Sequence, residues 1–398
     1  MEGFDFSKEY GIVLEGGGAK GAYQIGVWKA MRELGIKIKG ISGVSVGALN
    51  GALICMGDID KAIKLWESIT YDRVMEVDNE QMEHIMKREL KQLKLVDLTK
   101  TGMKVLASRG FNVTPLKSMI EEVVEEDRIR NSDIEFYLGT FCISDMKQLE
   151  ICAKEAEPER LKDYLLASAY FPAFKNEKLH GLSYVDGGVM NNVPIDTLIK
   201  NGYKDIIVVR IYGLGIEKRV KIPEDVSVTT IAPRVELGSI LEFDGKKTGR
   251  NITIGYYDAM RVFKSLKGKI YYVDSRLNER ECLELFLECN KSVAMAYHEY
   301  YKLDYLKEEL FTRGMLEIIL PLVAEELKLS KEWSYLDLYL ALLELCAKYM
   351  HVQKYYIYTE QELVDKIRVK YELRKKRRDS KEIPTFVQLA LGFITIRE

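Results

Sequence analysis

The sequence predicts an α/β fold with a mainly parallel sheet, followed by a helical C-terminal region. Strand-like and helix-like runs alternate over residues 11–56, and this alternation is typical of parallel sheets covered by helices. The chain has 398 residues and 47% hydrophobic content, which allows a sizeable core and is long for a single domain. After about Val273 the chain becomes charged, rich in tyrosine and poor in glycine, which predicts a second, helical region.

The first two strand–helix units are the clearest part of the pattern. The apolar run Gly11–Leu14 predicts a buried strand, and a glycine cluster follows it. Residues Ala22–Leu34 carry apolar side chains near helical spacing, and Gly35 is a suitable helix stop. The second unit is a strand at Ile36–Ile41, a glycine-containing turn, and a helix of small apolar residues at Val46–Met56.

The middle of the chain continues the same alternation with weaker signals. Asp58 is a suitable N-cap for a helix that runs to about Ile69, and Thr114 with Pro115 predicts a helix start with threonine as the N-cap. The other expected elements are a charged helical insertion at Asn79–Lys100, strands at Ile134–Ser144 and Gln148–Ala153, a helix at Glu159–Ala169, and strands at Tyr184–Val185 and Asp205–Tyr212. We place the domain boundary near residue 275, so that residues 276–398 form the helical C-terminal region.

Composition and charge exclude several classes of protein. The chain has 59 Lys and Arg against 61 Asp and Glu, which offers no electrostatic basis for nucleic-acid binding. Met1–Tyr10 lacks the apolar run of a signal peptide, and no stretch reaches the roughly 18 apolar residues of a spanning helix. The six cysteines form no C-x-x-C pair and are expected to be ordinary thiols. We therefore expect a soluble cytoplasmic protein, with peripheral membrane contact left open.

The strongest chemical signal is the G-x-S-x-G motif at Gly43–Gly47. A nucleophilic serine needs a sharp strand-to-helix turn that exposes its hydroxyl, and glycines two positions before and after it remove clashing side chains. The following helix directs its N-terminal dipole at the serine oxygen. The pentapeptide alone also fits an ordinary tight turn. The strand-like run before it and the small-residue helix after it favour Ser45 as a nucleophile supported by Gly43 and Gly47.

A glycine loop, Gly16–Gly21, lies between the first strand and the first helix. Successive backbone N–H groups in such a loop form an anion-binding nest, which in an acyl-transfer enzyme would hold the oxyanion. The loop also matches G-x-G-x-x-G, but a dinucleotide site needs an acidic residue about 20 positions later, and Ile36–Ile41 contains none. A phosphate-binding P-loop needs Ser or Thr after Lys20, where Gly21 stands. The oxyanion role is therefore favoured.

A third motif is Asp186-Gly187-Gly188, which is followed by Asn192-Val193-Pro194. A carboxylate at a strand end followed by two glycines is held rigidly on an uncrowded turn. Alone, the motif is more typical of a plain Asp-Gly turn. It gains weight only beside the other two motifs.

Together these motifs resemble those of the patatin-like phospholipase family. That family combines a G-G-G-x-K/R-G loop, a G-x-S-x-G motif about a strand and a helix later, and a D-G-G or D-G-A motif much further on. The apolar segment Ala167–Phe174 also resembles the proline-containing segment that precedes the aspartate in such proteins. The resemblance runs from about Gly11 to Tyr212 and is looser to about Phe263. It does not cover the final third of the chain.

The resemblance implies a three-layer α/β/α fold and hydrolysis of fatty-acyl esters of phospholipids or lysophospholipids. It implies Ser45 as nucleophile, Asp186 as base, and the amides of Gly16, Gly17 and Gly18 as the oxyanion hole. The residues that complete the motifs are Lys20, Gly21, Gly43, Gly47, Gly187 and Gly188. The resemblance also implies no metal requirement, and the chain shows no calcium-loop pattern, so we expect no cofactor and a lipid substrate as the partner.

Two other functions remain open at the level of sequence. A Ser-His-Asp esterase of the α/β-hydrolase kind would use His298 or His351, which follow Asp186 in the required order but lie in helical patterns. A catalytically idle lipid-binding or scaffold protein would use its helical region for contacts. The five consecutive cations of Arg374–Arg378 suit an anionic membrane surface, although a solvated helix end is the more ordinary interpretation.

Overall fold

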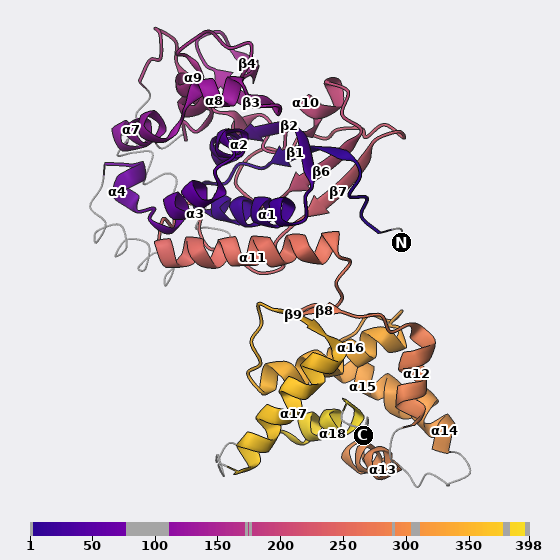
Figure 1. Ribbon diagram of the computed structural model, residues 1–398. Coiled ribbons are helices and arrows are strands. Elements are labelled where there is room, and N and C mark those ends of the chain that lie inside the picture. The colour runs from indigo at the N-terminus through magenta and orange to yellow at the C-terminus, as the bar shows by residue number, and fades with distance from the viewer. Residues whose placement is uncertain are drawn as a thin grey trace. The chain divides into compact units, whose positions relative to one another are not determined.

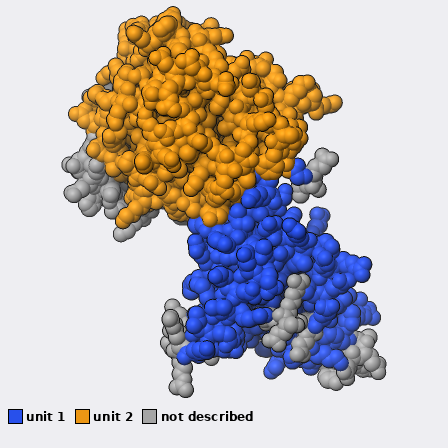
Figure 2. All heavy atoms as spheres, in the orientation of Figure 1, with its two compact units in different colours: residues 1–3, 263–398 blue, residues 4–262 orange. Residues whose placement is uncertain are grey.

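The chain forms two compact units. The computed structural model describes residues 3–76, 111–171, 174, 177–288, 291–303, 311–376 and 383–394, so the expected insertion at 79–100 lies outside the described residues. An α/β unit spans Phe4–Val262, and a helical unit is made mainly of Phe263–Glu398 (Figure 2). The helical unit begins before the predicted boundary near 275, because Tyr271 and Val273 already belong to its core.

A seven-stranded, mainly parallel sheet forms the centre of the α/β unit (Figure 1). The strand order is β4-β3-β2-β1-β6-β7, and β5 pairs with β3. The parallel strands are β1 (Glu9–Leu14), β2 (Lys37–Val44), β3 (Glu135–Cys142), β6 (Asp205–Val209) and β7 (Ser227–Ile231). Two strands run antiparallel to β3, namely β4 (Lys147–Cys152) and β5 (Tyr184–Asp186). The expected α/β class is confirmed.

Helices cover this sheet. They are α1 (Ala22–Glu33), α2 (Val46–Met56), α3 (Ile59–Glu67), α4 (Tyr71–Val74), α7 (Thr114–Val123), α8 (Glu126–Arg130), α9 (Leu161–Ser168), α10 (Ile195–Lys200) and α11 (Gly245–Phe263). Short 3-10 turns lie at Gly18–Gly21 (η1) and Gly187–Val189 (η2). Five of the six residues of β1 are buried, as expected for a strand covered on both faces. Side chains of α10 pack against Val13 on one of those faces.

The helix α11 packs unusually close to α1. A Cβ on Gly26 would lie 1.9 Å from the carbonyl oxygen of Ile252, and one on Gly255 would lie 2.0 Å from that of Tyr23. Glycine at both positions therefore lets the two backbones meet directly. This contact anchors α11, and with it the segment that precedes α11 and borders the candidate site.

The helix starts show one confirmed cap and one correction. Asp58 caps α3 as predicted, since its carboxylate accepts from the amide of Lys61 at 2.9 Å. Thr114 is not an N-cap, because α7 begins at Thr114 itself. The side-chain oxygen of Asn112 accepts hydrogen bonds from the Thr114 amide at 2.9 Å and from the Thr114 hydroxyl at 2.7 Å. An Asx-type bond two residues back therefore replaces the predicted threonine cap.

The helical unit has its own core, which includes the buried side chains of Phe286, Tyr297 and Leu342. Its helices are α12 (Glu279–Leu287), α13 (Lys291–Tyr300), α14 (Phe311–Gly314), α15 (Leu320–Glu326), α16 (Tyr335–Tyr349), α17 (Glu360–Lys376) and α18 (Thr385–Ile394), with a π-helical turn (η4) at Met315–Ile319. Strands β8 (Tyr272–Asp274) and β9 (Ile357–Thr359) pair in parallel. None of the helices in the described parts of the chain is long and apolar enough to cross a membrane.

Candidate active site

Ser45 lies on the tight turn between β2 and α2, in a backbone conformation that side chains rarely adopt. Its φ is 53° and its ψ is −130°, and such strain typically costs about 1–3 kcal/mol. A Cβ on Gly43 would lie 2.6 Å from the carbonyl carbon of Gly47, and one on Gly47 would lie 2.2 Å from the carbonyl oxygen of Leu14. The close backbone approach explains why this turn needs both glycines.

The backbone of this turn is hydrogen-bonded to Ser168, at the end of α9. The Ser45 amide donates to the Ser168 hydroxyl at 2.9 Å, and this hydroxyl donates to the carbonyl of Gly139 in β3 at 2.7 Å. Ser168 is fully buried, so both bonds are shielded from water. The sequence analysis did not assign this role. The available signal was a lone serine inside the apolar segment Ala167–Phe174.

Asp186 ends β5 and is buried beside Ser45. Burial raises the pKa of its carboxyl to about 6, although hydrogen bonds from the Ser45 side chain and the Gly188 amide act in the opposite direction. The Gly188 amide donates to Oδ1 at 2.7 Å. A Cβ on Gly187 would lie 2.3 Å from the carbonyl oxygen of Gly139, so glycine is required where the loop that follows Asp186 crosses β3.

Neighbouring residues of β3 pair with the residue before Ser45 and with Asp186. Gly139 pairs with Val44, which directly precedes Ser45, and Thr140 pairs with Asp186. Ser45 and Asp186, far apart in sequence, are therefore held at adjacent positions of one strand. The structure brings together the two side chains that the sequence analysis selected.

The glycine loop offers two backbone amides to this site. The amides of Gly17 and Gly18 have no acceptor among the described residues, and both glycines line the same cavity as Ser45. The amide of Gly16 was predicted as a third donor, but it already donates to the carbonyl of Asn192 at 3.3 Å. Gly16 is therefore removed from the assignment as an oxyanion donor. Glycine is still required there, because a Cβ on Gly16 would lie 2.4 Å from the side-chain oxygen of Asn192.

Two further residues of the loop hold it in place. The ammonium group of Lys20 donates to the carbonyl of Tyr212 at 2.7 Å. A Cβ on Gly21 would lie 2.4 Å from a methyl group of Val46 in α2. Lys20 and Gly21 thus support the loop, and neither is among the residues that line the cavity.

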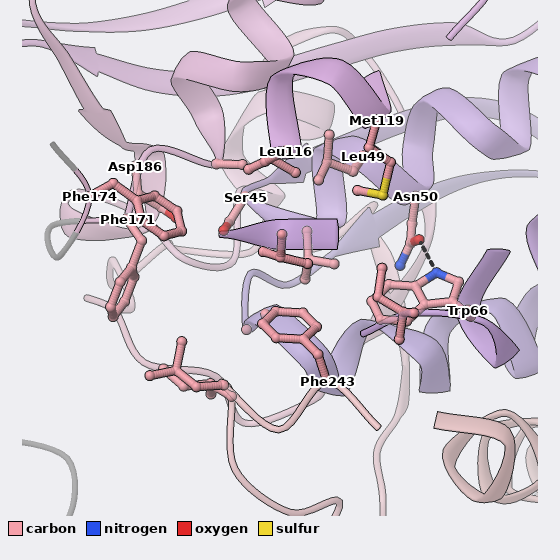
Figure 3. A pocket seen from close by; sticks show the side chains of 18 of the residues that line it. Ser45, Leu49, Asn50, Trp66, Leu116, Met119, Phe171, Phe174, Asp186 and Phe243 are labelled. Atoms are coloured by element: carbon pink, nitrogen blue, oxygen red, sulfur yellow. Dashed lines mark hydrogen bonds between the residues drawn. The ribbon is translucent and has the colours of Figure 1, made fainter. Parts of the chain in front are cut away.

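An apolar cavity of about 110 Å³ opens beside Ser45 (Figure 3). Its wall is formed by Gly17, Gly18, Ser45, Val46, Leu49, Asn50, Leu53, Leu65, Trp66, Ile69, Val74, Leu116, Met119, Ala169, Phe171, Phe174, Asp186, Asn192, Leu214, Ile240, Leu241 and Phe243. The side chain of Asn50 accepts from the indole of Trp66 at 3.0 Å and donates to the Gly21 carbonyl at 2.9 Å. Because these polar atoms form hydrogen bonds within the protein, the part of the wall formed by Asn50 and Trp66 presents mainly apolar surface to a ligand.

Histidine is absent from the cavity wall within the described parts of the chain. His180 contacts Asp163 at 2.6 Å and is largely exposed. His298 is buried in α13 and His351 follows α16, both in the helical unit. His84 lies outside the described residues. The described residues also contain no group of three or more His, Cys, Asp or Glu side chains that could hold a metal ion.

Comparisons with known proteins relate the α/β unit to one family. Residues 12–199 match the family model "Patatin-like phospholipase". A patatin-like phospholipase domain-containing protein of Caenorhabditis elegans, ZK370.4, is 29% identical over 202 residues, and the neuropathy target esterase sws of Drosophila melanogaster is 30% identical over 199 residues. Each match covers 50% of this chain but only 13% and 12% of those proteins. The crystal structure of VipD from Legionella pneumophila aligns over 97% of this chain and 91% of its own, at 12% identity and a TM-score of 0.40, too low to equate the two folds.

Proposed function

Since residues 12–199 form a domain of the patatin-like phospholipase family, we propose that the protein hydrolyses fatty-acyl esters of phospholipids or lysophospholipids. The observation that carries this proposal is the pairing of Ser45, on a strained turn, with a buried Asp186 beside an apolar cavity. A fatty-acyl chain suits a wall of this kind, because burial of each CH₂ group contributes about 0.8 kcal/mol.

In the first half-reaction the acyl chain occupies the cavity and the ester carbonyl lies beside Ser45. The Ser45 hydroxyl oxygen attacks the carbonyl carbon while its proton moves to the Asp186 carboxylate. The carbonyl oxygen becomes an oxyanion and accepts hydrogen bonds from the amides of Gly17 and Gly18. The intermediate then collapses, the ester C–O bond breaks, and the leaving alcohol takes the proton from Asp186. The acyl group remains on Ser45.

In the second half-reaction water takes the place of the alcohol. Asp186 accepts a proton from the water as its oxygen attacks the acyl-enzyme carbonyl. The same two amides stabilise the second oxyanion. Its collapse releases the fatty acid and returns the proton to the Ser45 oxygen, so that both side chains are restored.

An aspartate can serve as the base because its surroundings change its basicity. A solvated aspartate has a pKa near ~3.9 and is a weak base for an alcohol. Burial raises the pKa of Asp186 to about 6, which makes it a stronger base while still leaving most of it ionised at neutral pH. The N-terminus of α2, which begins directly after Ser45, also favours the negative charge that forms on attack.

A hydrolysis panel tests this proposal. The wild type and Ser45→Ala are incubated with phospholipids, lysophospholipids, triglycerides and a soluble short-chain ester, and released fatty acid is measured. We expect fatty acid from phospholipid or lysophospholipid with the wild type and none with Ser45→Ala. Release of head groups without fatty acid, or equal release by the two proteins, would refute the proposal. Turnover of the soluble ester alone would indicate an esterase that does not act on lipid.

A further inference from the structure

A loop segment, Ile211–Ile216, contacts both the glycine loop and the loop that follows Asp186. It follows β6, and we call it the strap. Gly213 packs on the glycine loop so closely that a Cβ there would lie 1.8 Å from the carbonyl oxygen of Gly16. At the other end of the segment, the Ile216 amide donates to the carbonyl of Gly188, in the loop that follows Asp186 (the base loop), at 2.8 Å. The strap therefore contacts the candidate oxyanion hole and the loop of the base at once.

The first three amides of the strap are bound by one buried carboxylate, that of Glu15. This side chain is 2% exposed. It accepts from three successive strap amides, those of Ile211 at 2.6 Å, Tyr212 at 3.0 Å and Gly213 at 3.1 Å. Arg210 donates its Nε to the same carboxylate at 3.0 Å. The acceptor capacity of the carboxylate is thus used within the protein, and Glu15 is not among the residues that line the cavity.

Asn192 closes the arrangement from the other side. Its carbonyl accepts from the Gly16 amide at 3.3 Å, and its side chain donates to the Gly16 carbonyl at 3.1 Å. The same side-chain nitrogen lies 3.5 Å from the Glu15 carboxylate. The backbone that enters the oxyanion hole is therefore fixed by Glu15 on one side and Asn192 on the other.

We infer that Glu15 is a positioning residue, which sets the direction of the Gly17 and Gly18 amides by binding the strap to the glycine loop. The inference rests on the proposed acyl-hydrolase function. Glu15 lies two residues before Gly17, so a shift of its carboxylate moves the oxyanion donors directly. A displacement of about 1 Å in such a donor costs about 100-fold in rate.

The substitution Glu15→Gln tests the role with little change in volume. Glutamine has one acceptor oxygen in place of two, and its NH₂ group would face the strap amides, which are donors. We expect kcat for a soluble p-nitrophenyl ester to fall about 100-fold while KM stays within about 3-fold, because the oxyanion forms only after attack. The rate of Ser45 labelling by a fluorophosphonate should fall in parallel with kcat.

A matched control is Glu217→Gln. Glu217 makes the same kind of bond to Arg210, at 3.0 and 2.8 Å, but its side chain is 59% exposed and no described contact joins it to a strap amide. We expect near wild-type kcat. If it lowers kcat as much as Glu15→Gln, the arginine rather than the strap amides carries the effect, and the inference fails.

Gly213→Ala provides a second variant if Glu15→Gln does not fold, as judged by circular dichroism. The added methyl forces the strap from Gly16 without touching Glu15, and it should give the same loss of kcat at unchanged KM. Folded variants that keep the wild-type kcat, or in which only KM rises, overturn the inference while leaving the proposed function intact. A wild type that neither turns over ester nor reacts with fluorophosphonate overturns the proposed function, and the inference with it.

Discussion

Replacing Asp186 by asparagine should lower kcat strongly and stabilise the α/β unit at the same time. Asparagine keeps an acceptor oxygen for the Gly188 amide, which now donates to Oδ1 at 2.7 Å, but it cannot accept the proton of Ser45. We expect kcat to fall by about 100- to 10,000-fold, the usual contribution of a general base. The gain in stability comes from removing a carboxylate whose ionised form is penalised by burial.

The size of this gain follows from the pKa of Asp186. The carboxyl ionises near 3.8 in the unfolded chain and near 6 in the folded protein, so the wild type loses stability as pH rises through this window. Linkage gives a loss of about 1 kcal/mol at pH 4.5 and about 3 kcal/mol at pH 8, since one pKa unit corresponds to about 1.4 kcal/mol. Asparagine carries no charge at either pH. The variant should therefore exceed the wild type by these amounts.

Urea unfolding followed by tryptophan fluorescence measures this difference. The chain has three tryptophans, of which Trp28 and Trp66 are buried in the α/β unit and Trp333 lies in the helical unit. Both proteins therefore carry Trp333→Phe, so that the signal reports the α/β unit alone. The comparison at pH 4.5 and pH 8 isolates the ionisation of Asp186.

The control is Asp196→Asn, which removes a buried carboxylate that has a cationic partner. Asp196 accepts from Lys218 at 2.7 Å and is 6% exposed, so its loss should lower stability at pH 8, in contrast to Asp186→Asn. If the difference in unfolding free energy between Asp186→Asn and the wild type does not grow between pH 4.5 and pH 8, the carboxyl is not desolvated in the way described. The argument for an aspartate base would then fail.

The remaining predictions concern the same site and the helical unit. The kcat/KM of the wild type should rise with pH with a midpoint near the Asp186 pKa of about 6, because the carboxylate must be ionised to accept the proton. Gly18→Ala should lower kcat more than Gly17→Ala, since a Cβ on Gly18 meets the Ile240 carbonyl oxygen at 2.1 Å and φ is 55°, whereas Gly17 meets a movable methyl group of Ile211 at 2.8 Å. Alanine at His180, His298 or His351 should leave most activity, and a folded histidine variant as inactive as Ser45→Ala would refute the dyad. Neutralising Arg374–Arg378 should weaken binding to anionic vesicles in a flotation assay and spare turnover of a soluble ester.

The motifs were predictable from sequence because local backbone geometry determines them. The turn at Ser45 needs glycines at fixed spacing, and the helix after it runs over Val46–Met56, the predicted range. These features depend on neighbours within a few residues. They are therefore visible in the order of the residues alone.

The features that sequence analysis missed depend on contacts between distant segments. The Gly16 amide was predicted to be free, and only the fold places the Asn192 carbonyl against it. The boundary predicted near residue 275 differs from the start of the compact helical unit at Phe263, and Tyr272–Asp274 pairs with Ile357–Thr359, a partner that no local pattern indicates. No role for Glu15 was predicted from the sequence, since its partners in the strap lie about two hundred residues away.

The attachment of the Ser45 turn and of Asp186 to adjacent residues of β3 has a consequence for motion. Val44 pairs with Gly139 and Asp186 pairs with Thr140, so we expect bending of the sheet to displace Ser45 and Asp186 together. We therefore expect the separation between their side chains to depend mainly on β3 and on the helices attached to the turn, α2 and α9. By the same argument, we expect a shift of α3 or α7, which contribute to the cavity wall, to change the shape of the cavity with little effect on the separation between Ser45 and Asp186.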